Sequence, residues 1–258
     1  MIGILYFFVI ILANSIGAVS GMGGGVIIKP IFDLIGAHSV ASISFYSTVA
    51  VFTMSISSTL KQLKSGQVFE VGTIIWISGG AVLGGILGNF SFEQLLASLG
   101  SENQVTMIQI VLTIITLIFT FLYSKYEWRS YTFKAPIFYF GSGLLLGFLA
   151  SLLGIGGGPI NVSVLMLLFG FPIKKATSYS ICTIFFSQLA KLLAIATGSG
   201  FLQYDLTMLY FIIPAAILGG LFGAKLSQLL PSAKVALIFQ SVILLVLGIN
   251  LFNFIQLL

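Results

Sequence analysis

The chain has 258 residues, of which 58% are hydrophobic and only 7% are charged, and its mean hydropathy is +1.15. Soluble domains carry about 25% charged residues, so this composition excludes a water-soluble surface and indicates an integral membrane protein. The formal net charge of +5 would indicate a nucleic-acid-binding protein only if the basic residues formed a patch, but they lie in short gaps between apolar segments. Cys182 is the only cysteine, which excludes an intramolecular disulfide and a cysteine metal cluster, and we expect no cofactor or metal.

Apolar segments follow one another along the whole chain. A membrane-spanning helix needs about 20 apolar residues, and eight segments have about this length: 2–20, 39–60, 70–89, 104–124, 135–153, 174–197, 205–224 and 234–256. The first segment has no basic region before it and no small-residue cleavage site, so we expect a membrane helix there and not a signal peptide. Two shorter segments, 26–36 and 159–170, each follow a run of three glycines. The sequence therefore predicts an all-α polytopic membrane protein.

The second half of the chain repeats the first. Gly23-Gly24-Gly25 matches Gly156-Gly157-Gly158, 133 residues later, and "AVLGGILG" at 81–88 matches "AILGGLFG" at 216–223. Internal repeats are common in secondary transporters. We predict a first repeat over 1–124, a cytoplasmic linker over 125–134 and a second repeat over 135–258, which together form one membrane domain. Each repeat is expected to contain four long transmembrane helices and a short half-helix after its GxGGG break.

The basic residues indicate that the two repeats are inverted. Lys and Arg accumulate in the cytoplasmic loops of membrane proteins. The gap at 61–68 carries two lysines and its equivalent at 198–204 carries none, whereas the gap at 90–103 carries two glutamates and its equivalent at 225–234 carries two lysines. Inverted repeats would place the linker and most basic residues on the cytoplasmic face of the cell membrane, with both termini outside. A parallel arrangement of the repeats is the alternative.

The glycine runs predict two broken helices that form a binding site. Glycine weakens helices, and unwound backbone inside a membrane is tolerated only against protein or a water-filled cavity. A half-helix that begins near Val26 or Pro159 would direct free N–H groups and a positive dipole end toward the break. Two such helix starts, approaching from opposite faces, would bind an anion near the bilayer midplane. Close packing of helices is the alternative role for these glycines.

The motifs "GMGGGVIIKP", "GIGGGPINVSVLMLLFG" and "KKATSYS" resemble the repeated signature of the sulfite exporter TauE/SafE family, and the resemblance covers nearly the whole chain. The sequence departs from the family pattern at Val162-Ser163, where members often carry a Val-Pro pair, whereas Lys29-Pro30 keeps the proline in the first half. The resemblance implies a membrane transporter associated with export of sulfite, of sulfonates such as sulfoacetate, or of related organic anions.

Several polar residues are candidates for the anion site. Lys29 lies about half way through the bilayer, where a charge is costly and usually functional, and Asp33 is on the same helix face, so Lys29 either pairs with Asp33 alone or also attracts the anion. Lys191 either lines a pathway or extends outward to the membrane surface. Asn161, at the start of the second short helix, is a donor for an oxyanion. The predicted substrate-binding residues are Gly23, Gly24, Gly25, Lys29, Ser44, Thr48, Gly156, Gly157, Gly158, Asn161, Thr177, Ser180, Ser187 and Lys191.

Other polar and small residues have structural interpretations. Two helices carry stripes of Ser and Thr, which either join helices or line a pathway for a hydrated oxyanion. The stripes comprise Ser44, Thr48, Ser55, Ser58 and Gln62, and Thr177, Ser180, Thr183 and Ser187. Rows of small residues, centred on Gly84 and Gly219, are expected to pack helices together. Glu70 and Asp205 are expected at helix starts.

The sequence favours a secondary transporter for a small anion. An anion channel shares the same features, and an intramembrane enzyme would need a catalytic constellation, for which only Ser187 and Lys191 are candidates, so no enzyme activity is expected. The partners expected are a small anionic substrate and the lipid bilayer, and no nucleic acid. The substrate's identity, a coupling proton or ion and the oligomeric state are not encoded in any motif that we identify.

Overall fold

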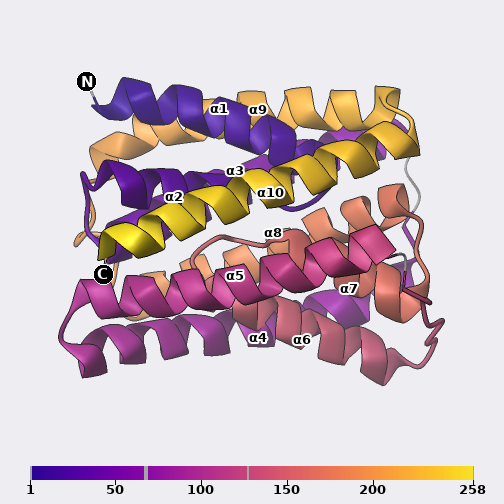
Figure 1. Cartoon of the computed structure of the whole chain (residues 1–258), viewed down its shortest axis with the longest axis horizontal. Helices are drawn as coiled ribbons and strands as arrows, with labels where there is room; N and C mark the ends of the chain where they lie inside the picture. Colours follow the sequence, from indigo (N-terminus) through magenta and orange to yellow (C-terminus); the bar gives the residue numbers. More distant parts are fainter. Residues whose placement is uncertain (1, 67–68, 127, 258) are drawn as a thin grey trace.

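The structure is a computed structural model that describes residues 2–66, 69–126 and 128–257, and within these ranges it contains helices and no strand. In chain order the helices are α1 (Ile2–Ser20), α2 (Gly25–Ile35), α3 (Val40–Lys64), α4 (Val71–Leu99), α5 (Glu102–Tyr126), α6 (Pro136–Leu152), α7 (Pro159–Phe169), α8 (Ile173–Thr197), the 3₁₀ helix η1 (Leu206–Met208), α9 (Leu209–Leu229) and α10 (Ser232–Leu257). The long helices run roughly side by side along the longest axis of the molecule (Figure 1). The predicted all-α class is confirmed.

Seven helices in the described ranges are long and apolar enough to cross a membrane: α1, α3, α4, α5, α8, α9 (with η1) and α10. The expected long segment at 135–153 differs, because α6 has only 17 residues before the chain turns into the second glycine run. The short helices α2 and α7 have 11 residues each. At 1.5 Å per residue each is about 16 Å long, roughly half the thickness of a bilayer's hydrocarbon core. The two predicted half-helices are therefore present.

The polar gap expected at 90–103 is mostly helical. α4 continues to Leu99 and ends at Gly100, which has the left-handed backbone conformation (φ +61°) typical of a helix C-terminus. Glu102 then begins α5, and its carboxylate accepts a hydrogen bond from the Val40 backbone N–H at 2.9 Å. Polar side chains in this stretch therefore lie on helices that extend beyond the apolar segment.

The two halves of the chain are interleaved in one bundle. α4 packs against α6 and α8, α9 packs against α1 and α3, and α5 contacts α7 and α10. The small-residue rows make these close contacts possible: a Cβ atom on Gly84 would overlap the Leu144 carbonyl oxygen of α6, and one on Gly223 would overlap the Ser15 carbonyl oxygen of α1. The prediction that these rows pack helices is confirmed.

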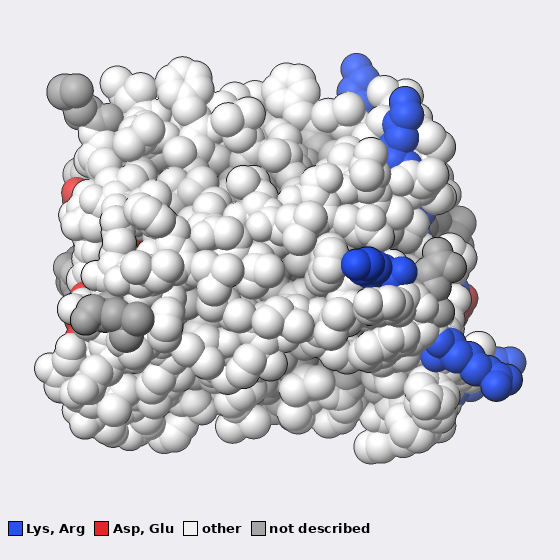
Figure 2. Space-filling model, viewed as in Figure 1, with Lys and Arg blue, Asp and Glu red and all other residues white. Residues whose placement is uncertain are grey.

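Charge is distributed unevenly along the bundle axis. Both termini lie at one end of the bundle, and the connection between α5 and α6 lies at the other (Figure 1). The Lys and Arg side chains visible in Figure 2 gather at this second end, which we call the basic end. α3 brings Lys61 and Lys64 in its last turn, and α5 brings Lys125 in its last turn. The asymmetry is the one that the positive-inside rule associates with a fixed membrane orientation.

Candidate functional site

The two glycine runs are buried, and the turns that lead into them have positive φ at two corresponding places, although the runs then differ: Gly24 has φ −72° and Gly157 has φ +139°. The residues with positive φ at corresponding places are Gly21 (+73°) and Gly23 (+75°), and Gly154 (+67°) and Gly156 (+66°). Glycine adopts this region without steric cost. A long backbone hydrogen bond closes each turn, from Gly23 N–H to the Gly17 carbonyl (3.3 Å) and from Gly156 N–H to the Ala150 carbonyl (3.2 Å). The same turn is therefore built twice, 133 residues apart.

The two breaks face each other inside the bundle. A Cβ atom on Gly25 would overlap the Ile155 carbonyl oxygen, and one on Gly157 would lie 3.2 Å from the Met22 carbonyl oxygen. The runs therefore pack backbone against backbone, and the start of α2 touches the second break. This confirms the expectation that both runs are non-helical and adjacent, although Gly25 is already the first residue of α2.

Three buried side chains near the breaks have polar atoms without a hydrogen-bond partner in the described part of the chain: Asn14 (Oδ1), Ser47 (Oγ) and Asn161 (Nδ2). A Cβ atom on Gly25 would lie 2.8 Å from the Ser47 oxygen, and one on Gly24 would overlap Asn14 Oδ1. Asn161 was predicted from the sequence, whereas Asn14 and Ser47 were not. In the sequence, Asn14 could have been noticed as the one amide side chain within the apolar segment 2–20.

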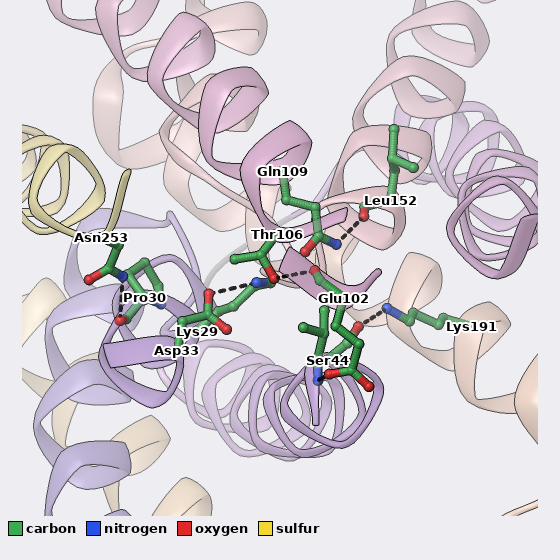
Figure 3. Close-up of polar contacts among 11 residues, drawn as sticks. Lys29, Pro30, Asp33, Ser44, Glu102, Thr106, Gln109, Leu152, Lys191 and Asn253 are labelled. Atoms are coloured by element: carbon green, nitrogen blue, oxygen red, sulfur yellow. Dashed lines mark hydrogen bonds and ion pairs between the residues drawn. The ribbon is translucent and has the colours of Figure 1, made fainter. Parts of the chain in front are cut away.

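Lys191 is a buried lysine. Lys191 is 1% exposed, and its Nζ donates hydrogen bonds to Ser44 Oγ at 2.8 Å and to the Ser151 carbonyl at 3.0 Å (Figure 3). It also lies 5.3 Å from the centre of the Phe92 ring. Among the residues that the structure describes, no carboxylate lies within 4.0 Å of it. The outward extension considered for Lys191 is therefore wrong: the lysine turns inward because the last turn of α6 offers it a carbonyl at the negative end of a helix dipole.

Lys29 forms a buried ion pair with Asp33 on α2. The Lys29 Nζ to Asp33 Oδ2 distance is 2.7 Å, and the two side chains are 4% and 9% exposed (Figure 3). Asn253 of α10 donates to the Pro30 carbonyl at 2.8 Å and so ties α2 to α10. The predicted pairing is confirmed, and an additional role of Lys29 toward an anion stays a prediction.

The side chains of Ser44 and Lys29 both lie beside Gly154, at the second break. The Ser44 oxygen accepts a hydrogen bond from Lys191, and a Cβ atom on Gly154 would lie 2.7 Å from that oxygen and 3.4 Å from Cε of Lys29. Because an ammonium group can only donate, the Ser44 hydroxyl hydrogen is not used in its bond with Lys191. We call Lys29, Ser44, Gly154 and Lys191 the lysine cluster. The cluster brings together α2 and α3 of the first half and the second break and α8 of the second half.

The hydroxyl stripes on α3 and α8 are buried, and most of their hydrogens are used within their own helix. Thr48, Thr177 and Ser187 each donate to a carbonyl one turn earlier. Besides Ser44, which accepts from Lys191, two stripe residues donate to another segment: Ser58 donates to the Gly220 carbonyl of α9 at 3.3 Å, and Ser180 donates to the Gly21 carbonyl at 2.5 Å. Ser180 thus holds the first break in place, and Ser58 joins helices.

A small cavity of about 90 Å³ reaches the lysine cluster from one end of the bundle. Its wall includes the buried residues Lys191, Ser44 and Asn89, and the exposed residues Glu93 and Ser199. Since a water molecule occupies about 30 Å³ in the liquid, the volume corresponds to roughly three waters. The cavity thus links the buried Lys191 and Ser44 with exposed residues at that end of the bundle.

Two carboxylates singled out in the sequence have local roles at helix starts. Glu70 precedes α4 and pairs with Lys175 at 2.7 Å, and this hydrogen bond and charge hold the pKa of Glu70 below its usual value. Asp205 precedes η1, and its carboxylate accepts hydrogen bonds from the Thr207 hydroxyl at 2.6 Å and from the Thr207 backbone N–H at 3.0 Å, which lower its pKa. Neither residue contacts the lysine cluster.

Membrane-length helices, paired breaks and buried charged side chains define this protein as a membrane transporter with a polar site inside its bundle. The chain belongs to the sulfite exporter TauE/SafE family, whose sequence model matches residues 6–251. A relative from Bacillus subtilis (strain 168), "Probable membrane transporter protein YunE", is 27% identical in an alignment that covers 92% of each chain. No solved structure matches the chain. The family resemblance predicted from the motifs is confirmed, and the family is one of transporters and not of enzymes.

Proposed function

We propose that the protein is a secondary transporter that exports a small anion such as sulfite or an organosulfonate. The observation that carries this proposal is Lys191: a buried lysine whose hydrogen-bond partners, Ser44 and the Ser151 carbonyl, are both neutral. A charge inside a membrane protein is costly and is usually retained for function. An anion that binds beside Lys191 would offset that cost, whereas a cation would increase it.

The breaks would supply the remaining contacts. The N-termini of α2 and α7 direct helix dipoles toward the breaks, and Ser47 and Asn161 hold donor atoms without partners beside them. Because the glycine runs contact each other directly, we infer that the described conformation is closed around this site. Binding of the anion would accompany separation of the two breaks, with Lys29 and Lys191 providing positive charge on one side.

Transport by alternating access would use the two repeats as moving parts. Three observations support inverted repeats. The same turn occurs at both breaks, and α4 of the first half packs against α6 and α8 of the second half, whereas α9 of the second half packs against α1 and α3 of the first. The third observation is that basic side chains lie at the end opposite both termini (Figures 1 and 2). Inverted repeats permit one half to rock against the other around a fixed site. By the positive-inside rule the basic end would be cytoplasmic and both termini outside.

The experiment that tests the function is anion flux into proteoliposomes. Sulfite and sulfoacetate labelled with ³⁵S would be supplied with and without a pH gradient, and protein-free liposomes would set the background. We expect saturable uptake, which a carrier shows and an open channel does not. A flux of every tested anion at the protein-free background would refute the proposal, and a dependence on the pH gradient would identify a proton as the coupling ion.

A further inference from the structure

A second and larger cavity lies between α5, α7 and α10. Its volume is about 440 Å³, which is within the range of roughly 300–1,000 Å³ typical of small-molecule sites. Aromatic walls come from Tyr123, Trp128 and Phe239, and polar groups come from Ser163 and Gln240. The last turn of α5 and the first turns of α10 line it, so it opens near the basic end of the bundle (Figure 1).

Ser163 is the unusual group in this cavity. The residue is 0% exposed, it lines the cavity, and its hydroxyl has no hydrogen-bond partner in the described part of the chain. In the first half the residue 133 positions earlier is Pro30, whose carbonyl accepts the amide of Asn253. The corresponding place in the first half is thus closed by a protein contact, whereas in the second half a buried hydroxyl faces a cavity. Buried polar groups without a partner are rare, and a ligand is one explanation for them.

The first turns of α10 give this cavity an anion-binding character. α10 has 26 residues, and its residues Ser232, Ala233 and Ala236 line the cavity. The first N–H groups of a helix have no partner within the helix, and its dipole favours negative charge there. None of the residues that line the cavity is acidic, and Lys125 and Arg129 are sequence neighbours of lining residues.

We propose that this cavity, the basic-end cavity, is a loading site for a short organic anion. Its acid group, a sulfonate or a carboxylate, would bind the α10 N-terminus and the Ser163 hydroxyl, and its carbon chain would contact Trp128 and Phe239. An inorganic anion would leave most of the volume and the aromatic walls without contact. The inference rests on the proposed transport function and adds a second anion site, at the basic end of the bundle and apart from the two breaks.

Fluorescence tests the cavity without a transport measurement. The chain has two tryptophans, Trp76 and Trp128, and only Trp128 lines this cavity. In a Trp76→Phe variant of the full chain, reconstituted in zwitterionic lipid, Trp128 is therefore the only indole reporter. Ethanesulfonate is the anionic probe, and ethanesulfonamide is its neutral match in shape. We expect a saturable change of Trp128 emission with ethanesulfonate and a much weaker response to ethanesulfonamide.

Two variants locate the probe. Ser163→Ala should weaken ethanesulfonate binding by about tenfold or more, because hydrogen bonds to charged groups contribute at least that factor. Ala236→Leu, which fills the cavity, should abolish the response. Ser142→Ala is the matched control: this buried serine donates within α6 and does not line the cavity, so binding should be unchanged.

The outcomes separate this inference from the proposed function. Unchanged ethanesulfonate affinity in both Ser163→Ala and Ala236→Leu would overturn the loading site, and equal binding of ethanesulfonamide would overturn its anionic class. If the wild type transports anions while Trp128 does not respond, the loading site is wrong and the transport proposal stands. If no anion is either bound or transported, the transport proposal itself is refuted.

Discussion

Replacing Lys191 with methionine should weaken anion binding by roughly ten- to hundredfold without unfolding the protein. Methionine has a similar length and no charge. The change removes two hydrogen bonds, to Ser44 at 2.8 Å and to the Ser151 carbonyl at 3.0 Å, which together contribute about 3–6 kcal/mol to stability if each bond to a charged group contributes about 1.5–3 kcal/mol. It also removes a buried charge whose desolvation costs several kcal/mol. Because these two effects are of similar size and opposite sign, the free energy of unfolding should change little.

Anion binding should respond in the opposite direction. A hydrogen bond between charged groups contributes about 1.5–3 kcal/mol, which corresponds to roughly a ten- to hundredfold loss of affinity when it is removed. Thermal unfolding in detergent and anion flux in proteoliposomes would be measured on the same Lys191→Met preparation. Ser44→Ala is the companion variant, because it removes one partner of Lys191 and keeps the charge, and it should reduce flux less.

Two results would refute this reasoning. Wild-type flux in Lys191→Met would show that the buried charge does not act on the substrate. A large fall in the unfolding temperature, with flux lost in proportion to folded protein, would show that Lys191 stabilises the end of α6 and has no separate role in transport.

The remaining predictions concern the ion pair on α2, helix packing and topology. The Lys29→Ala variant should weaken anion binding, and the combination with Asp33→Asn decides why: recovery of wild-type flux in the double variant would mean that Lys29 serves only to pair with Asp33. Gly84→Ala should destabilise the bundle by about 1–3 kcal/mol or more, since its Cβ would overlap a carbonyl of α6. Gly248→Ala is the control, because Gly248 has open space around it, and equal melting temperatures of the two variants would contradict this packing. A cysteine at Lys64, with the native cysteine replaced, should react with a membrane-impermeant thiol reagent only after the cytoplasmic side is opened, and labelling in intact cells would exclude the inverted orientation.

Local patterns in the sequence were sufficient for the membrane class, for the helices and for the two breaks. Apolar segments of about 20 residues leave few alternatives to helices in a bilayer, because every backbone polar group must be paired within the segment. The breaks followed from glycine runs, and the structure shows why glycine is needed there: Gly23 and Gly156 have φ near +70°, and the Ile155 carbonyl leaves no space for a side chain at Gly25. The half-helices α2 and α7 were predicted because the apolar segments that follow the glycine runs are too short to cross a bilayer. The extension of α4 to Leu99 was missed because its last turns are too polar to count as an apolar segment.

The contacts within the site were decided by the tertiary structure. Helical periodicity placed Lys191 on a polar face of its helix, but both an inward and an outward lysine are compatible with that face. The choice depends on Ser44 and the Ser151 carbonyl, which lie 147 and 40 residues away along the chain. Ser47 and Asn14 likewise became notable only when their oxygens were found beside Gly25 and Gly24. A sequence pattern reports the environment of a residue along its own helix, whereas a buried site is formed by side chains from helices whose separation and rotation depend on packing across the whole bundle.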